Sequence, residues 1–121
     1  MNEQMNEQLI SFNTAKLAKE KGFNLNESAK VGFSPDGLEL SESFWNYHCN
    51  EKGSIARPTQ SLLQKWLREV CKISVLCHVW NGLLAHYCIT SVAGKHNTQT
   101  RIYDTYEEAL EEGLQKAIQL I

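Results

Sequence analysis

The sequence predicts an α+β domain in which three helices pack on a mostly antiparallel sheet, in the order α-β-β-α-β-β-β-α. Two observations carry most of this prediction: an amphipathic helical pattern after Pro58 and a two-residue hairpin signal at Asn81-Gly82. A third is the capping sequence Asp104-Thr105-Tyr106-Glu107, which precedes another run of apolar residues at helical spacing. Together these signals indicate an architecture and specify no chemistry.

Length and composition indicate one globular domain. The chain has 121 residues, enough for a single hydrophobic core, and its 42% hydrophobic and 21% charged content is ordinary for a globular protein. The first eight residues repeat an Asn-Glu-Gln unit that offers nothing to bury. We therefore expect a disordered polar tail over 1–8 and a single domain over 9–121.

Charge and hydropathy point to the cytoplasm. A formal net charge of -2 gives no general attraction to nucleic-acid phosphates or anionic lipid. No apolar run approaches the roughly 18 residues that span a bilayer, and the start of the chain lacks the cationic region of a signal peptide. We expect a cytoplasmic protein that does not act at a membrane.

The first helix is predicted from Ser11, which can cap it, to Lys21, with Gly22 in the left-handed closing position. The turn Ser34-Pro35-Asp36-Gly37 then predicts a hairpin. Pairing Phe33 with Leu38 gathers the apolar residues of the hairpin on one face, so we expect that register. The stretch 41–57 is predicted to continue as strand and to fall into a loop.

The helix after Pro58 shows the clearest pattern in the chain. Large apolar residues recur at helical spacing and form one stripe, which is Leu62, Leu63, Trp66, Leu67 and Val70. The opposite face carries polar residues, which are Gln60, Gln64, Lys65 and Arg68. Since a fully buried large apolar side chain contributes about 1.5–3 kcal/mol, the stripe is predicted to be core.

Two strands, 73–80 and 83–90, flank Asn81-Gly82. A two-residue turn pairs Trp80 with Leu83 and therefore Cys77 with His86. Both faces of this hairpin are substantially apolar, which favours a central place in the sheet.

A loop over 93–97 and a short strand over 100–103 lead to the last helix. Its predicted buried stripe is Tyr106, Ala109, Leu110, Gly113, Leu114, Ala117, Ile118 and Ile121. Glycine in mid-helix costs about 1 kcal/mol relative to alanine. Gly113 therefore predicts a close backbone approach at this point.

Three segments resemble a family of small phage, prophage and mobile-element proteins of gut bacteria: 10–23, 58–69 and 104–115. The segments 24–57 and 77–99 follow no pattern of that family. The family carries no established activity and no catalytic residues to transfer. The resemblance implies an accessory protein of a phage or mobile element.

The cysteines show no Cys-x-x-Cys pair, so four free thiols are expected, at Cys49, Cys71, Cys77 and Cys88. The predicted hairpin register brings Cys77, His86 and Cys88 together, with His48 and Cys49 as outside donors, which makes a weak candidate zinc site. Buried cysteines more often fill small spaces in a core. We expect no metal and no cofactor.

Enzymatic chemistry is not indicated. Cys77 with His86 is the minimum pair for a thiol enzyme, but a nucleophile in the middle of a core strand has no access to substrate. The sequence lacks a Gly-rich phosphate loop, a Gly-x-Ser-x-Gly elbow and a His-Glu-x-x-His pair. The carboxylates of the last helix, Glu107, Glu108, Glu111 and Glu112, suit the helix dipole and solvent.

A protein-interaction role is the first of two binding hypotheses. Phe44, Trp45 and Tyr47 cannot all point into one core if they lie on a strand, so at least one ring is expected at the surface. Trp45 could instead cap a core edge. The expected partner is a protein of unknown identity, and the oligomeric state stays open, with edge-to-edge pairing of the sheet as one route to a dimer.

Nucleic-acid binding is the alternative. Lys16, Lys19, Lys65 and Arg68 would form a modest basic strip if the first and second predicted helices pack side by side. A solvated helix face explains the same residues, since no aromatic platform accompanies them.

Overall fold

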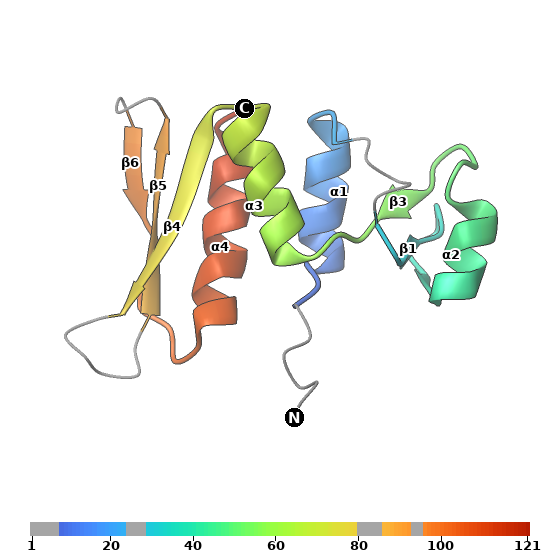
Figure 1. Cartoon of the computed structure of the whole chain (residues 1–121), viewed down its shortest axis with the longest axis horizontal. Helices are drawn as coiled ribbons and strands as arrows, with labels where there is room; N and C mark the ends of the chain where they lie inside the picture. Colours follow the sequence, from blue (N-terminus) through green and yellow to red (C-terminus); the bar gives the residue numbers. More distant parts are fainter. Residues whose placement is uncertain (1–7, 24–28, 80–85, 93–95) are drawn as a thin grey trace. The chain divides into compact units, whose positions relative to one another are not determined.

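The computed structural model describes residues 8–23, 29–79, 86–92 and 96–121 and shows an α+β chain with antiparallel sheets (Figure 1). Contacts divide the chain into two compact units, Met1–Ser61 and Leu62–Ile121. Residues 1–7 of the predicted tail lie outside the description, whereas the Gln8 carbonyl accepts a hydrogen bond from the Gln60 amide at 2.8 Å. The expectation of a single domain over 9–121 stays a prediction.

The predicted element order is wrong in the first half of the chain. Over the described ranges the chain forms four helices and two three-stranded sheets, where the sequence predicts three helices and one sheet. The additional elements are α2 (Glu42–His48) and β3 (Ile55–Ala56), and both lie in the stretch predicted to be strand and loop.

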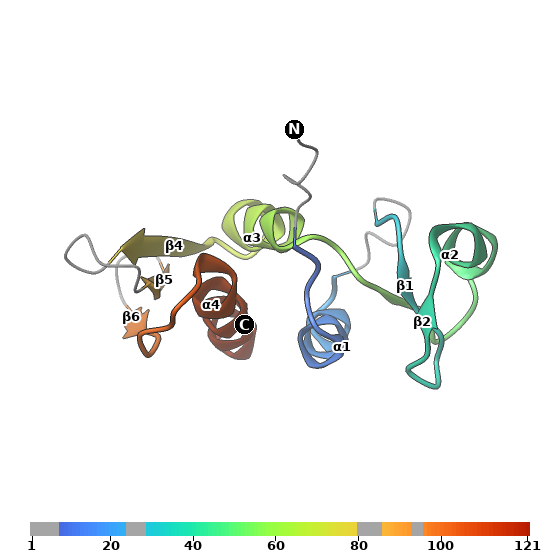
Figure 2. The same ribbon diagram turned by 90° about the horizontal axis from the view of Figure 1, so that it is seen from below.

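In the first unit a small sheet separates two helices (Figures 1 and 2). The strand order is β2-β1-β3, with β1 at Gly32–Phe33 and β2 at Glu39–Leu40. Helix α1 (Phe12–Glu20) packs at β3, and α2 packs at β1 and β2. The unit is therefore a layered arrangement of helix, sheet and helix.

Both predicted ends of α1 are confirmed. The Ser11 hydroxyl accepts a hydrogen bond from the Thr14 amide at 3.3 Å and so caps the first turn. At the other end Gly22 has φ 103°, and its amide donates to the Lys19 carbonyl at 3.1 Å. Glycine adopts this left-handed conformation without steric cost.

The register of the first hairpin differs from the prediction by one residue. Phe33 pairs with Glu39, and Gly32 pairs with Leu40. The Leu38 carbonyl instead accepts the Ser34 amide at 2.9 Å and helps to close the turn, which leaves the Leu38 side chain 67% exposed. The register predicted from matching apolar residues is wrong because the Phe33 ring packs against Phe12, in a T-shaped contact.

The second unit contains one sheet in the order β4-β5-β6, with all neighbours antiparallel. The strands are β4 (Ile73–Val79), β5 (His86–Val92) and β6 (His96–Gln99). Helix α4 (Tyr106–Gln119) packs on β4 and β5. Helix α3 (Gln60–Glu69) starts two residues before the unit does.

The pairing of β4 with β5 is confirmed, but its register is wrong by two residues. Cys77 lies opposite Cys88, and not opposite His86 as predicted. A shift of two keeps the predicted division of residues between the faces, because side chains alternate with a period of two. The turn at Asn81-Gly82 lies outside the described residues. The last strand is also displaced: β6 ends at Gln99, before the predicted strand over 100–103 begins.

Helix α4 is capped by Thr105, one residue later than its sequence signal suggests. The Thr105 hydroxyl accepts the Glu108 amide and donates to the Glu108 carboxylate, both at 3.1 Å. The predicted close backbone approach at Gly113 stays a prediction; at this point the buried Thr90 hydroxyl donates to the Gly113 carbonyl at 3.3 Å. Tyr106 and Ile121, the ends of the predicted stripe, are 42% and 43% exposed.

The apolar stripe of α3 is confirmed at its centre only. Leu63 and Leu67 are fully buried and Trp66 is 7% exposed, whereas Val70 follows the helix and is 63% exposed. The polar face also differs from the prediction. Gln60 is buried, and the Gln64 side-chain amide donates to the Val75 carbonyl of β4.

Candidate protein-interaction site

Helix α2 is fixed to the first unit by one buried side chain, Trp45. The indole is fully buried, and its Nε1 donates to the Ala29 carbonyl at 3.1 Å. Its ring lies so close to Gly32 of β1 that a Cβ on Gly32 would overlap the indole and the Ile55 carbonyl. The orientation of α2 about its axis is therefore set by packing and by a hydrogen bond.

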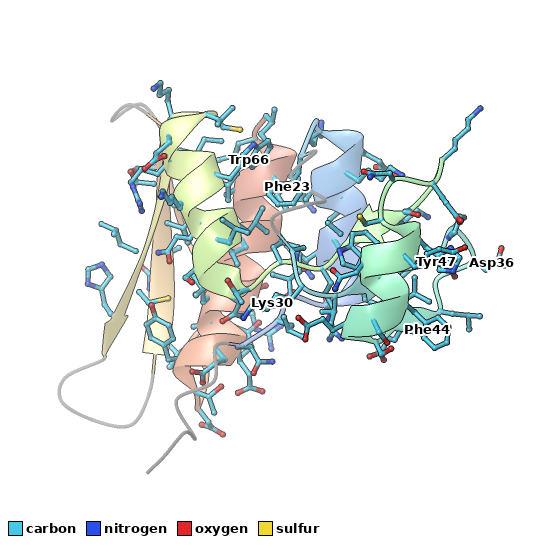
Figure 3. The ribbon with its side chains drawn as sticks, turned by 45° about the vertical axis from the view of Figure 1, so that its right-hand side comes forward. Phe23, Lys30, Asp36, Phe44, Tyr47 and Trp66 are labelled. Carbon is cyan, nitrogen blue, oxygen red and sulfur yellow. The ribbon has the colours of Figure 1, made fainter. Side chains whose placement is uncertain are left out.

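Two aromatic residues on the outward face of α2 remain exposed. Phe44 is 60% exposed and Tyr47 is 82% exposed. They lie three residues apart, so they occupy neighbouring positions on one helix face, and Figure 3 shows both rings directed away from the ribbon. The Tyr47 ring also meets the His48 ring edge to face, with centroids 4.8 Å apart. We call Phe44 and Tyr47 the aromatic face of α2.

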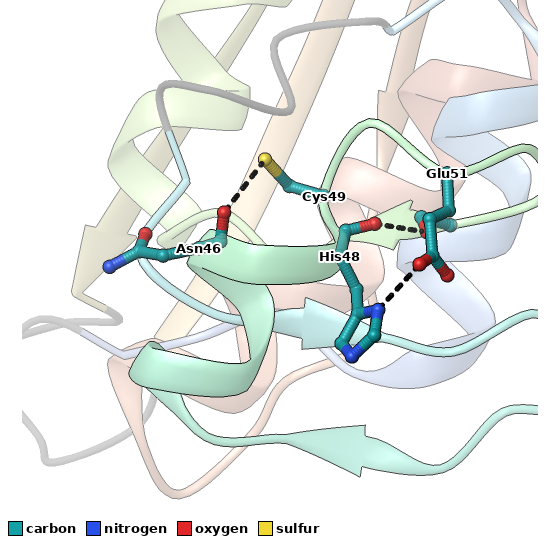
Figure 4. Close-up of polar contacts among 5 residues, drawn as sticks. Asn46, His48, Cys49 and Glu51 are labelled. Carbon is teal, nitrogen blue, oxygen red and sulfur yellow. Dashed lines mark hydrogen bonds and ion pairs between the residues drawn. The ribbon is translucent and has the colours of Figure 1, made fainter.

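The carboxyl end of α2 is closed by polar contacts (Figure 4). The His48 carbonyl accepts hydrogen bonds from the Glu51 amide at 3.0 Å and from the Ser54 hydroxyl at 2.9 Å. Nδ1 of His48 lies 2.6 Å from a carboxylate oxygen of Glu51. These contacts order the turn that follows the aromatic face.

The part of the chain that contains the aromatic face is rich in carboxylates. The stretch from Ser34 to Glu51 contains no lysine or arginine, and its four carboxylates are Asp36, Glu39, Glu42 and Glu51. All four residues are exposed. Two of them have partners: Nη1 of Arg57 lies 3.0 Å from the Glu39 carboxylate, and Nδ1 of His48 lies 2.6 Å from the Glu51 carboxylate.

The structure divides the three predicted protein-binding residues. Phe44 and Tyr47 are exposed as a binding role requires, whereas Trp45 is core and cannot contact a partner. The error has a simple cause: the parity argument assumed a strand, and the residues lie on a helix, where a residue between two exposed ones can point inward. The exposed Leu38 was not foreseen, since its exposure follows from the shifted hairpin register.

The residues of the predicted basic strip are divided between the two units. Lys16 and Lys19 lie on α1 in the first unit, and Lys65 and Arg68 lie on α3 in the second. All four are exposed, and Nζ of Lys19 donates to the Ser54 carbonyl at 2.8 Å. Neither unit by itself carries the whole strip.

The cysteines differ from the expectation of four free thiols. Cys49 and Cys71 are free, and burial raises the pKa of the Cys71 thiol, but Cys77 is disulfide-bonded. A disulfide sulfur is not a thiolate ligand, so the weak zinc candidate loses Cys77. The side chains of His86 and Cys88 lie outside the description. Across the part of the chain that is described, no group of three or more His, Cys, Asp or Glu residues is placed to hold a metal.

A second polar cluster lies on α4 around Tyr103. The lining residues are Tyr103, Glu108, Glu111, Glu112 and Gln115. The Tyr103 hydroxyl donates to the Glu112 carboxylate at 2.5 Å, and this bond, together with burial and the negative charge of Glu112, raises the pKa of Tyr103. The phenol is thus held protonated as a donor, so it is not poised to act as a base.

Comparison with known proteins does not add to this geometry. No family model, curated protein or solved structure matches the chain. Among the residues whose structure is described, no helix has the length and apolar character needed to cross a bilayer.

Proposed function

We propose that this chain is a non-enzymatic protein-interaction module, an accessory protein of a phage or mobile element, and that the aromatic face of α2 is its contact surface. One observation carries the proposal: Phe44 and Tyr47 are exposed on a helix that the buried Trp45 holds in place. The phage or mobile-element setting is supported by the resemblance of the three helical segments.

The energetics favour binding at this face. Burying a large apolar side chain contributes about 1.5–3 kcal/mol, so two exposed rings offer a useful part of a binding free energy. Aromatic residues are also over-represented among the side chains that dominate protein interfaces. Because α2 is already ordered, little conformational entropy is lost when a partner docks.

The test compares wild-type protein with the double variant Phe44→Ala/Tyr47→Ala in affinity capture from the bacterial host. We expect the double variant to lose the captured partner, while its free energy of unfolding stays within about 1 kcal/mol of wild type because both rings are largely exposed. Thermal unfolding followed by circular dichroism checks the second part.

A matched control removes exposed apolar surface from the second unit. The variant Leu76→Ala/Tyr106→Ala truncates side chains that are 57% and 42% exposed. It should capture the same partner as wild type. Equal capture by wild type and by the α2 variant would exclude the aromatic face as the contact surface.

Nucleic-acid binding by the lysines of α1 and the basic residues of α3 stays the alternative proposal. A gel shift at low salt tests it, with Lys16→Gln/Arg68→Gln as the variant. Retardation that this variant abolishes would favour nucleic acid over a protein partner, and no retardation at high protein excess would remove the alternative.

A further inference from the structure

We propose that the partner of the aromatic face is a basic protein segment, one that presents arginine or lysine side chains between apolar residues. This inference rests on the proposed function, because it assigns the chemistry of the partner at the same site.

The first step is the charge of the surface around the rings. The four carboxylates between Ser34 and Glu51 outnumber the lysines and arginines nearest to this stretch along the chain, which are Lys30, Lys52 and Arg57, and His48 lies within the stretch. Arg57 already makes three contacts within the unit. Its Nη1 pairs with Glu39, its Nε donates to the Ile10 carbonyl at 2.6 Å, and its guanidinium lies 5.3 Å from the centroid of the Phe33 ring. Because Glu39 is paired with Arg57 and Glu51 with His48, the negative charge that favours a cationic partner comes mainly from Asp36 and Glu42.

The second step places a carboxylate near Tyr47. Glu51 lies one turn beyond Tyr47, in the segment that closes α2. The hairpin turn also lies at this end, since a Cβ on Gly53 would come within 3.0 Å of the Pro35 ring. Asp36 follows Pro35 in that turn, and Figure 3 shows it close to Tyr47 in the view. The His48 ring meets both the Glu51 carboxylate and the Tyr47 ring, so the Glu51 carboxylate lies near the more exposed ring.

The third step is the separation of charge within the first unit. Lys16, Lys19 and Lys21 lie on and just after α1, which packs on the other side of the small sheet from α2 (Figure 2). Lys19 reaches the segment that closes α2, because its Nζ donates to the Ser54 carbonyl at 2.8 Å, so Lys16 and Lys21 are the lysines that repel a cationic segment on the α1 side. Long-range electrostatic steering of this kind raises the association rate and orients the partner.

The fourth step is the match between the rings and a basic side chain. Guanidinium and ammonium groups are attracted to the faces of aromatic rings, and their aliphatic stems pack on apolar surface. A basic segment with interspersed apolar residues can pack on the rings and can pair its charged groups with the carboxylates. An acidic segment or a nucleic acid would meet repulsion from the same carboxylates.

The experiment measures fluorescence anisotropy of two short labelled peptides with the full-length chain, one of repeated Ala-Arg-Leu units and one of repeated Ala-Glu-Leu units. We expect the arginine peptide to bind and the glutamate peptide not to bind. Phe44→Ala/Tyr47→Ala should weaken binding of the arginine peptide about tenfold. Asp36→Asn/Glu42→Gln should weaken it about threefold and reduce its salt dependence.

The matched control, Glu107→Gln/Glu111→Gln, removes the same number of charges from α4 and should leave the affinity for the arginine peptide unchanged. Equal weakening by the control, equal binding of the two peptides, or no binding of the arginine peptide would overturn the assignment of a basic partner. A dimer seen by light scattering and abolished by Phe44→Ala/Tyr47→Ala would overturn it in favour of a second copy of the chain. Affinity capture from the host tests the contact surface independently of these peptides. A negative result with the peptides would therefore reject the basic partner without rejecting the aromatic face as the contact surface.

Discussion

Trp45 is the residue on which the candidate site depends, although it does not belong to the contact surface. Its indole packs over Gly32 and donates to the Ala29 carbonyl, so it ties α2 to β1 and to the segment before β1. The small size of Gly32 is therefore a packing requirement. One large buried side chain and one missing side chain together set the direction in which Phe44 and Tyr47 face.

Replacing Trp45 should destabilise the first unit. We expect Trp45→Ala to cost about 3–5 kcal/mol, since it removes a fully buried large side chain. Trp45→Phe keeps a ring but leaves the Ala29 carbonyl without its indole donor, which should cost about 1–3 kcal/mol. Urea denaturation measures both values. An unchanged midpoint for Trp45→Ala would show that the indole is not core.

Adding one methyl group at Gly32 should be costly as well. In Gly32→Ala the new Cβ would meet the indole ring and the Ile55 carbonyl, so the strand or α2 must shift, at about 1–3 kcal/mol. Gly22→Ala is a useful comparison, because no atom lies within 4 Å of its new Cβ and its cost comes from the positive φ alone. Loss of binding in Gly32→Ala with the fold retained would show that α2 has moved.

The oxidation states of the cysteines can be read directly by alkylation and peptide mass spectrometry. In unfolded, unreduced protein we expect iodoacetamide to label Cys49 and Cys71, and to label Cys77 only after a reductant is added. Labelling of Cys77 without reduction would contradict the disulfide and return Cys77 to the thiols expected from the sequence.

Among the secondary-structure elements, helices were predicted well where the capping residues and the spacing of apolar residues indicated the same helix. The ends of α1, for example, follow from Ser11 and Gly22. Helix α2 was missed because its seven residues are too few to show an amphipathic period, and because its direction depends on the distant Gly32. Registers were missed for a similar reason, since turn geometry and long-range packing decide them.

The N-cap of α4 provides a test at the level of elements. Thr105→Ala should destabilise the protein by about 1 kcal/mol, because the Glu108 amide loses its acceptor. Ser41→Ala is the matched control at the start of α2, where the serine side chain makes no capping hydrogen bond, so its effect should be smaller. Equal effects of the two substitutions in urea denaturation would contradict the assignment of the cap.

At the scale of the whole molecule, the candidate function belongs to the first unit. Its sheet separates a lysine-bearing helix from an acidic and aromatic one, whereas the described part of the second unit is an antiparallel sheet with α4 packed on β4 and β5. Within a formal net charge of -2 the first unit therefore has a partial division of charge, which is partial because Nζ of Lys19 donates to the Ser54 carbonyl beside α2. Composition alone predicts no such division, which appears only when hairpin and helix are placed in space.

The most direct test of the central claim is site-specific photo-crosslinking in the host. A photoreactive phenylalanine analogue replaces Tyr47 on the aromatic face, and in a second protein it replaces Tyr106, an exposed ring of the second unit. We expect a crosslinked host or phage protein from position 47 and none from position 106. Crosslinking from position 106 alone, or none from position 47 while the partner is still captured, would contradict this claim.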